Sequence, residues 1–199
     1  MGRIRERSVF IGCSSQGLKH AEALKNEIDS ELKRQGSDIE CMLWNEEDLF
    51  ELSYTTIENL VEIAKTLKGN GFAVMLLTPD DKVVINKGVG NEKDSFAARD
   101  NVIFELGFFM GVLGRERVYC VYPENKALRI PSDWNGVTNA QYHYVKTQRT
   151  HIQNKMIEPA KKIVNAILNA DKSVNTIDSV ERRALTKDDV MFDNLIYVM

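Results

Sequence analysis

The chain alternates between short apolar runs and longer segments in which apolar residues recur with helical spacing. Apolar runs of strand length stand at 8–15, 39–44, 72–77, 117–122 and 142–145. Segments that fit amphipathic helices, because apolar residues three or four positions apart share one helix face, stand at 16–35, 55–67 and 150–168. Polar or turn-rich segments that predict irregular loops stand at 82–94 and 123–136. This order predicts an α/β fold: a parallel sheet of about five strands with helices on both faces.

The helix predicted over residues 99–115 differs from the others because its apolar residues are too dense for one exposed face. It is too short to span a bilayer, so we expect other parts of the protein to cover it on nearly all sides. Gly107 and Gly111 lie one turn apart on it and would let a neighbouring element approach closely.

Glu105 is a single carboxylate in the middle of this apolar helix, and Asn101 lies one turn before it on the same side. Burying a carboxylate without a partner costs free energy and raises its pKa. Such a residue is a candidate for catalysis, although an ion pair with a lysine or arginine at the edge of the core explains it equally well.

Composition narrows the classes of function. The chain has 199 residues, 28% of them charged, and a net charge of -3, which gives no basic surface for nucleic acid. The apolar run near the start is too short for a signal peptide, and no membrane association is expected. Three widely spaced cysteines indicate reduced thiols in a cytoplasmic protein, and the cysteine and histidine spacing predicts no metal site.

In parallel sheets of this kind ligands bind beyond the carboxyl ends of the strands. The predicted binding edge therefore includes Ser14 and Ser15, the acidic loop over residues 44–53, and Asp80. The segment 12–17 is neither a Walker loop nor a dinucleotide fingerprint, and a plain turn between strand and helix explains it equally well.

Four segments together resemble one protein family, and they stand at 9–15, 44–60, 98–107 and 130–138. They are similar to the bacterial TIR (Toll/interleukin-1 receptor-like) domains of anti-phage defence. The nearest branch is that of predicted nucleotide-binding TIR-like proteins, often fused to cyclic-nucleotide sensors such as bacterial STING. The run RDNVIFELG at 99–107 is the specific part of a likeness that covers residues 8–168.

The resemblance implies a flavodoxin-like, three-layer fold and NAD⁺ glycohydrolase activity with Glu105 as the catalytic residue. It also implies a mobile loop at residues 45–53 that shapes the nicotinamide pocket and takes part in self-association. Cys13 departs from the serine or other small residue that the family often has there. We assign residues 1–170 to the TIR-like domain, and residues 171–199 to a linker or the start of a C-terminal sensor or partner segment.

The proposed chemistry is consistent with a single carboxylate. Ordinary glycoside hydrolysis needs a second acid to protonate a poor leaving group. Nicotinamide leaves the cationic ring of NAD⁺ as a neutral molecule, so one carboxylate suffices to stabilise the oxocarbenium-like charge or to attack the anomeric carbon. NAD⁺ is then the substrate, and no cofactor is required.

Several side chains are candidates for holding this substrate. Three aromatic residues that could wall the nicotinamide are Phe10, Trp44 and Phe50. Phe50 is preferred because its loop is polar, although each of the three is more commonly a plain core residue. Polar candidates for the ribose, its hydroxyls or phosphate are Ser14, Ser15, Asp80 and Asn101.

Three other functions fit the same sequence. A nucleoside deoxyribosyltransferase-like enzyme would transfer the sugar to another base. A non-catalytic TIR scaffold would only assemble with like domains, and a passive sensor would bind intact NAD⁺ tightly. The product, linear or cyclic ADP-ribose, and the activating ligand are left open by the sequence.

Overall fold

The structure is a computed structural model that describes residues 5–46, 49–50, 53–86, 92–131, 139–146 and 149–184. Its main sheet has five strands: β1 (Ser8–Cys13), β2 (Glu40–Leu43), β3 (Phe72–Leu76), β6 (Val118–Pro123) and β8 (Asn139–Tyr142). All neighbours pair in parallel, in the order β2-β1-β3-β6-β8. This is the flavodoxin-like order, in which the chain reverses direction across the sheet beside β1. The predicted fold class is confirmed.

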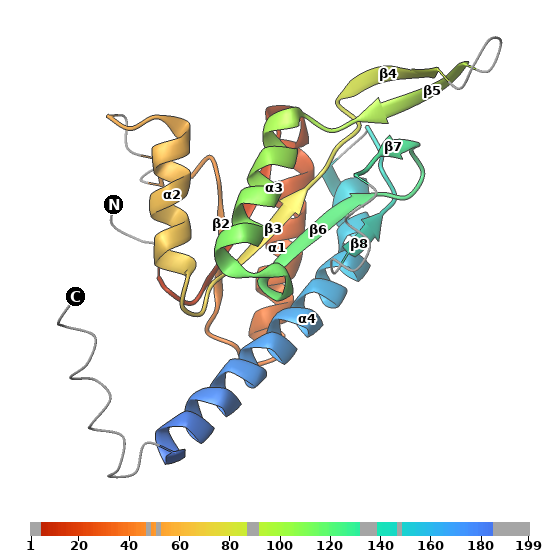
Figure 1. The fold of residues 1–199 in the computed structure, drawn as a ribbon. Coiled ribbons are helices and arrows are strands. Elements are labelled where there is room, and N and C mark those ends of the chain that lie inside the picture. Colours follow the sequence, from red (N-terminus) through yellow and green to blue (C-terminus); the bar gives the residue numbers. More distant parts are fainter. Residues whose placement is uncertain are drawn as a thin grey trace.

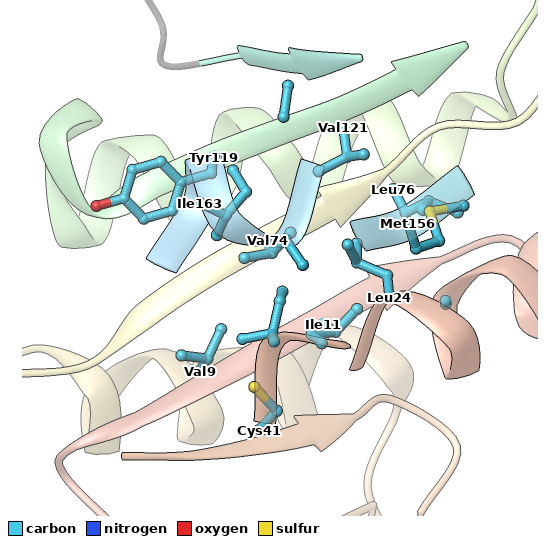
Figure 2. Packing of buried hydrophobic residues seen from close by; sticks show 14 of the residues in the cluster. Val9, Ile11, Leu24, Cys41, Val74, Leu76, Tyr119, Val121, Met156 and Ile163 are labelled. Carbon is cyan, nitrogen blue, oxygen red and sulfur yellow. The ribbon is translucent and has the colours of Figure 1, made fainter. Parts of the chain in front are cut away.

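Four helices cover this sheet (Figure 1): α1 (Leu18–Arg34), α2 (Thr56–Leu67), α3 (Asp100–Leu113) and α4 (Arg149–Ala184). Alternate strand residues point to opposite faces, and this divides the core in two. One cluster joins the sheet to α1 and α4, and Figure 2 shows Ile11 and Val74 there beside Leu24 and Met156. The second cluster joins the other face to α2 and α3. The fold therefore has three layers.

Local sequence explains where α2 begins. Thr55 accepts a hydrogen bond from the N–H of Glu58, and the Glu58 carboxylate accepts one from the N–H of Thr55 at 2.7 Å. This capping box satisfies backbone donors that would otherwise lack partners at the helix start. The helix predicted over residues 55–67 is thus confirmed as α2, which begins at Thr56.

The polar segment predicted as a loop at 82–94 instead contains strands. β4 (Asp81–Asn86) and β5 (Glu92–Ala97) pair antiparallel, and β5 pairs with β7 (Leu128–Arg129) in a separate small sheet. Backbone pairing holds this sheet, helped by the Ser95 hydroxyl, which donates to the Ala127 carbonyl at 2.6 Å. The sequence prediction was wrong here because a hairpin held by backbone pairing needs no regular alternation of apolar and polar residues, and the sequence of this segment shows none.

The expectation that α3 is covered on nearly all sides was also wrong for the described part of the chain. Val102, Leu106 and Phe109 are buried against the sheet, but Phe104 is 56% exposed. A Cβ atom added to Gly107 or Gly111 would meet no atom within 4 Å. One face of α3 is therefore an open apolar surface.

α4 continues beyond the helix predicted at 150–168, as far as Ala184 (Figure 1). Asp171, the first residue after the expected domain boundary, accepts a hydrogen bond of 2.6 Å from Arg7 at the start of the domain. The division at residue 170 stays a prediction, and residues 185–199 lie outside the described chain.

Candidate functional site

A cavity of about 550 Å³ opens beyond the carboxyl ends of β1 and β2, bounded by the first turns of α2 and α3. Its described lining comprises Phe10, Cys13, Ser14, Ser15, Trp44, Phe50, Thr56, Leu60, Arg99, Asn101, Val102 and Glu105. Seven of the eight predicted site residues are among them; Asp80 is the exception. Their convergence follows from the fold, because parallel strands end at one edge and α3 starts there after the β4–β5 hairpin.

Glu105 lies in the second turn of α3 and contributes the only acidic side chain among the described lining residues. Partial burial among apolar neighbours raises its pKa from 4.5 to about 7, and no opposing charge lowers it. No hydrogen bond or ion pair links its carboxylate to another described residue, so the alternative of an ion pair at the core edge finds no support in this part of the chain. Asn101 is exposed and lines the cavity one turn earlier, on the same side of the helix as predicted.

The aromatic candidates have different environments. Phe10 is fully buried and packs against Phe109 with ring centroids 5.1 Å apart, so it forms the floor and belongs to the core. Trp44 and Phe50 are half-buried at the rim. The indole Nε1–H of Trp44 donates to Cys13 Sγ at 3.2 Å, which ties the ends of β2 and β1 together. Trp44 therefore presents an oriented ring to the cavity.

The Cys13 thiol is held as a neutral group. Burial raises its pKa to about 12, and the nearby negative charge of Glu105 adds to this rise, whereas the Trp44 hydrogen bond opposes it. A thiol with so high a pKa is a poor nucleophile at neutral pH. Cys13 therefore adds no strong nucleophile to the described lining at neutral pH.

Ser14 and Ser15 lie directly after β1, where the short helix η1 (Ser15–Gly17) begins. Ser14 is buried, and its hydroxyl accepts from the Gly17 N–H at 3.1 Å and lies 3.2 Å from Thr78 Oγ1. Ser15 is exposed at the mouth of the cavity. Ser15 is therefore the freer of the two hydroxyls to meet a ligand.

Asp80 does not line the cavity; it lies in the loop that follows β3. Its Oδ1 accepts from Thr78 Oγ1 at 2.6 Å, and its Oδ2 is buried with no hydrogen-bond partner in the described structure. A chain of polar contacts thus runs from Asp80 through Thr78 to Ser14. Direct contact of Asp80 with a substrate hydroxyl stays a prediction, and the geometry favours an indirect role in positioning Ser14.

The sequence analysis did not single out four lining residues: Thr56, Leu60, Arg99 and Val102. The capping box at Thr55 was the available signal for Thr56, because it places the first turn of α2 at the same edge as the strand ends. The sequence also contained a signal for Arg99, because it stands at the start of α3, close to the predicted binding edge. It is the only basic side chain in the described lining.

Neither a metal centre nor a membrane span is found in what the structure describes. No group of three or more histidine, cysteine, aspartate or glutamate side chains there is placed to hold a metal ion. None of the described helices combines the length and apolar character needed to cross a bilayer.

Comparison with known proteins adds a family to this geometry. The family model described as CAP12/Pycsar effector protein, TIR domain, matches residues 8–144. CD-NTase-associated protein 12 of Niabella drilacis is 31% identical over 193 residues, which cover 96% of this chain and 54% of that protein. Pycsar effector protein PaPycTIR of Pseudomonas aeruginosa is 33% identical over 140 residues, covering 70% of this chain and 41% of that protein. The chain thus spans about half the length of these curated relatives.

Proposed function

The chain belongs to the CAP12/Pycsar effector TIR domain family of bacterial anti-phage effectors, and on that premise we propose that it hydrolyses NAD⁺ to nicotinamide and ADP-ribose. The observation that carries the proposal is Glu105, a half-buried carboxylate without a described partner in a cavity with aromatic walls. Its place in the matched family segment adds support.

The reaction would proceed at the bond between ribose C1′ and nicotinamide N1. As this bond breaks, its electron pair goes to the nicotinamide ring, which leaves as a neutral molecule. The ribose carries the developing positive charge, and the Glu105 carboxylate would stabilise it in surroundings that screen charge poorly. Water then adds to C1′, and its proton passes to Glu105 or to solvent, so that one carboxylate serves both halves of the reaction.

The aromatic rim would bind the nicotinamide ring. Trp44 is our first choice because the hydrogen bond to Cys13 fixes its ring, whereas the sequence pattern had favoured Phe50. Both line the cavity, and flat aromatic faces attract an electron-poor pyridinium ring. Asn101 and Ser15 are placed to bind ribose hydroxyls at the mouth.

The direct test is release of nicotinamide from NAD⁺ by the wild-type chain and by the Glu105→Gln variant. Glutamine keeps the shape but removes the negative charge, so we expect release to fall by about a thousandfold, in the range reported for losing one electrostatic catalytic group. Glu116→Gln, at an exposed position beyond the other end of α3, is the matched control and should retain activity. Equal activity of wild type and Glu105→Gln would exclude the proposal.

Further measurements on the same proteins separate the alternatives. Transfer of ribose to an added free base would indicate a transferase, whereas tight binding of intact NAD⁺ without turnover would indicate a sensor. A scaffold would assemble without binding NAD⁺ at all.

Self-association and control by a cyclic nucleotide form the second part of the proposal. Phe104 on α3 and Ile57 on α2 are 56% and 59% exposed, and such apolar surface favours contact between copies. The names of the relatives associate those proteins with CD-NTase and Pycsar systems. We propose that a cyclic-nucleotide signal, received by a sensing domain or partner, drives this assembly and thereby activates the site.

A further inference from the structure

Arg99 gives the mouth of the cavity a positive charge. It is the N-cap residue of α3, and its backbone carbonyl accepts from the N–H of Val102 at 3.0 Å, so its backbone position is fixed by the helix start. Its side chain lines the cavity and is 51% exposed. No other basic side chain is present in the lining that the structure describes.

An ion pair with a residue of the small sheet positions the side chain of Arg99. Its Nε lies 3.5 Å from Asp81 Oδ2 at the first position of β4. This ion pair is itself 45–51% exposed and contributes little stability. It engages Nε, and the described residues provide no hydrogen-bond acceptor for the terminal nitrogens Nη1 and Nη2. Those nitrogens remain for a ligand.

The two charged groups of the lining stand in a definite order. Glu105 is half-buried, whereas Arg99 is exposed and lies six residues earlier on the same helix, about 9 Å away along its axis. The cavity is thus negative inside and positive at its mouth. NAD⁺ carries charges in the complementary order: a cationic nicotinamide ribosyl group, then a diphosphate one ribose away.

We infer that Arg99 binds the diphosphate of NAD⁺ and makes the site selective for a dinucleotide over an uncharged nicotinamide riboside. This inference rests on the proposed function. The planar guanidinium donates paired hydrogen bonds that match phosphate oxygens. Holding the diphosphate at the mouth sets the depth of the nicotinamide ribose and brings C1′ to Glu105. Arg99 is then a binding residue that contacts the substrate without taking part in the bond change.

The test compares NAD⁺ with nicotinamide riboside as substrates of the wild-type chain and of Arg99→Gln. We expect kcat/KM for NAD⁺ to fall by about 10- to 100-fold, mostly through KM, because one charge-assisted contact is lost from ground state and transition state alike. Turnover of nicotinamide riboside should change less than about twofold, since this substrate has no phosphate for Arg99 to contact. Arg129→Gln removes the same charge from an exposed residue of β7 outside the described lining and should leave the turnover of both substrates unchanged.

An ordinary structural role would look different. If Arg99 serves only to hold Asp81, then Arg99→Gln and Asp81→Asn would each lower the turnover of both substrates equally. That result would overturn the inference. We expect Asp81→Asn to retain the preference for NAD⁺, because Arg99 itself remains.

Binding of ADP-ribose, measured by titration calorimetry, separates failure of this inference from failure of the proposed function. ADP-ribose contains the diphosphate but has no bond to nicotinamide. Binding that weakens about 10-fold or more in Arg99→Gln, in a chain that releases no nicotinamide, would support the diphosphate site and reject the hydrolase. Unchanged binding in an active hydrolase would reject the diphosphate site alone. Absence of both binding and cleavage in the wild-type chain would reject both.

Discussion

Trp44 Nε1–H and Cys13 Sγ meet at 3.2 Å, across the ends of two strands that pair in parallel. The contact belongs to the wall of the cavity and at the same time closes the edge of the core, since Trp44 packs against both hydrophobic clusters. An orienting bond of this kind makes an aromatic ring a more effective binding surface, because less rotational freedom is lost when the ligand arrives.

Trp44→Phe tests that orientation. Phenylalanine keeps an aromatic ring but has no donor for the Cys13 sulfur, so we expect KM for NAD⁺ to rise several-fold and unfolding to become easier by about 1 kcal/mol. Steady-state kinetics and urea unfolding measure the two effects. Cys13→Ser, which keeps an acceptor, is the control and should change KM less than Trp44→Phe does.

The pH dependence of the reaction follows from Glu105. Because burial raises its pKa to about 7, the carboxylate is largely protonated below that pH. We expect nicotinamide release to rise tenfold per pH unit below about 7 and to level off above it, with a single titrating group in kcat/KM. A profile that is flat from pH 5 to 8 would remove Glu105 from the catalytic step.

The folding stability should also depend on Glu105, but it should fall as pH increases, whereas the activity rises. In the unfolded chain Glu105 titrates near 4.5, so between pH 4.5 and about 7 the unfolded state gives up its proton first and the folded state loses relative stability as pH rises. Above pH 7, Glu105→Gln should therefore be the more stable protein by about 1–2 kcal/mol, a figure reduced for partial exposure to solvent. Below pH 4.5 the two should unfold alike in denaturant titrations.

The Thr78→Val variant tests the chain of polar contacts that runs from Asp80 through Thr78 to Ser14. Valine has the same shape but no hydroxyl, so the link between Asp80 and Ser14 is lost and Asp80 Oδ1 is left without its 2.6 Å donor. We expect a loss of about 1–3 kcal/mol in unfolding free energy, with reduced nicotinamide release from a less ordered Ser14. Thr66→Val is the matched control, because Thr66 is half-buried on α2, outside the described cavity lining, and among the described residues its hydroxyl bonds only to the Glu62 carbonyl of its own helix.

The capping box shapes the site through α2. Thr55→Ala removes the hydroxyl that accepts from the Glu58 N–H, and we expect it to cost about 1 kcal/mol of stability, read as a lower urea midpoint. Thr56 and Leu60 line the cavity from this first turn, so KM for NAD⁺ should rise too. Thr55→Ser retains the capping hydroxyl and should keep the urea midpoint and KM close to the wild-type values.

Self-association is tested at the open face of α3. Phe104→Glu places a charge on a side chain that is 56% exposed, so the monomer should fold normally. We expect assembly, followed by light scattering, to weaken, and NAD⁺ turnover to fall with it, because the proposed assembly activates the site. Lys161→Glu, on α4 at the other face of the sheet, is the comparison. If both variants assemble as well as the wild type, the α3 face is not the contact.

The sequence determined the main sheet, and most of the cavity lining could be predicted from it. Buried parallel strands appear as short continuous apolar runs, and their order along the chain limits the topology to few choices. Once the strand ends were known, Ser14, Trp44 and Glu105 were expected at one edge, and seven of the eight predicted residues line the cavity there.

Other features were decided by tertiary structure alone. The β4–β5 hairpin is held by backbone pairing within itself and with β7. No pattern of side chains in the sequence predicts this pairing. Asp80 accepts a hydrogen bond from Thr78 outside the cavity lining, Arg99 lines the cavity, and Phe104 stays exposed on the side of α3 that faces away from the sheet. The physical reason is that hydrophobic periodicity encodes which residues leave water, whereas the direction of a polar side chain depends on neighbours far away in the chain.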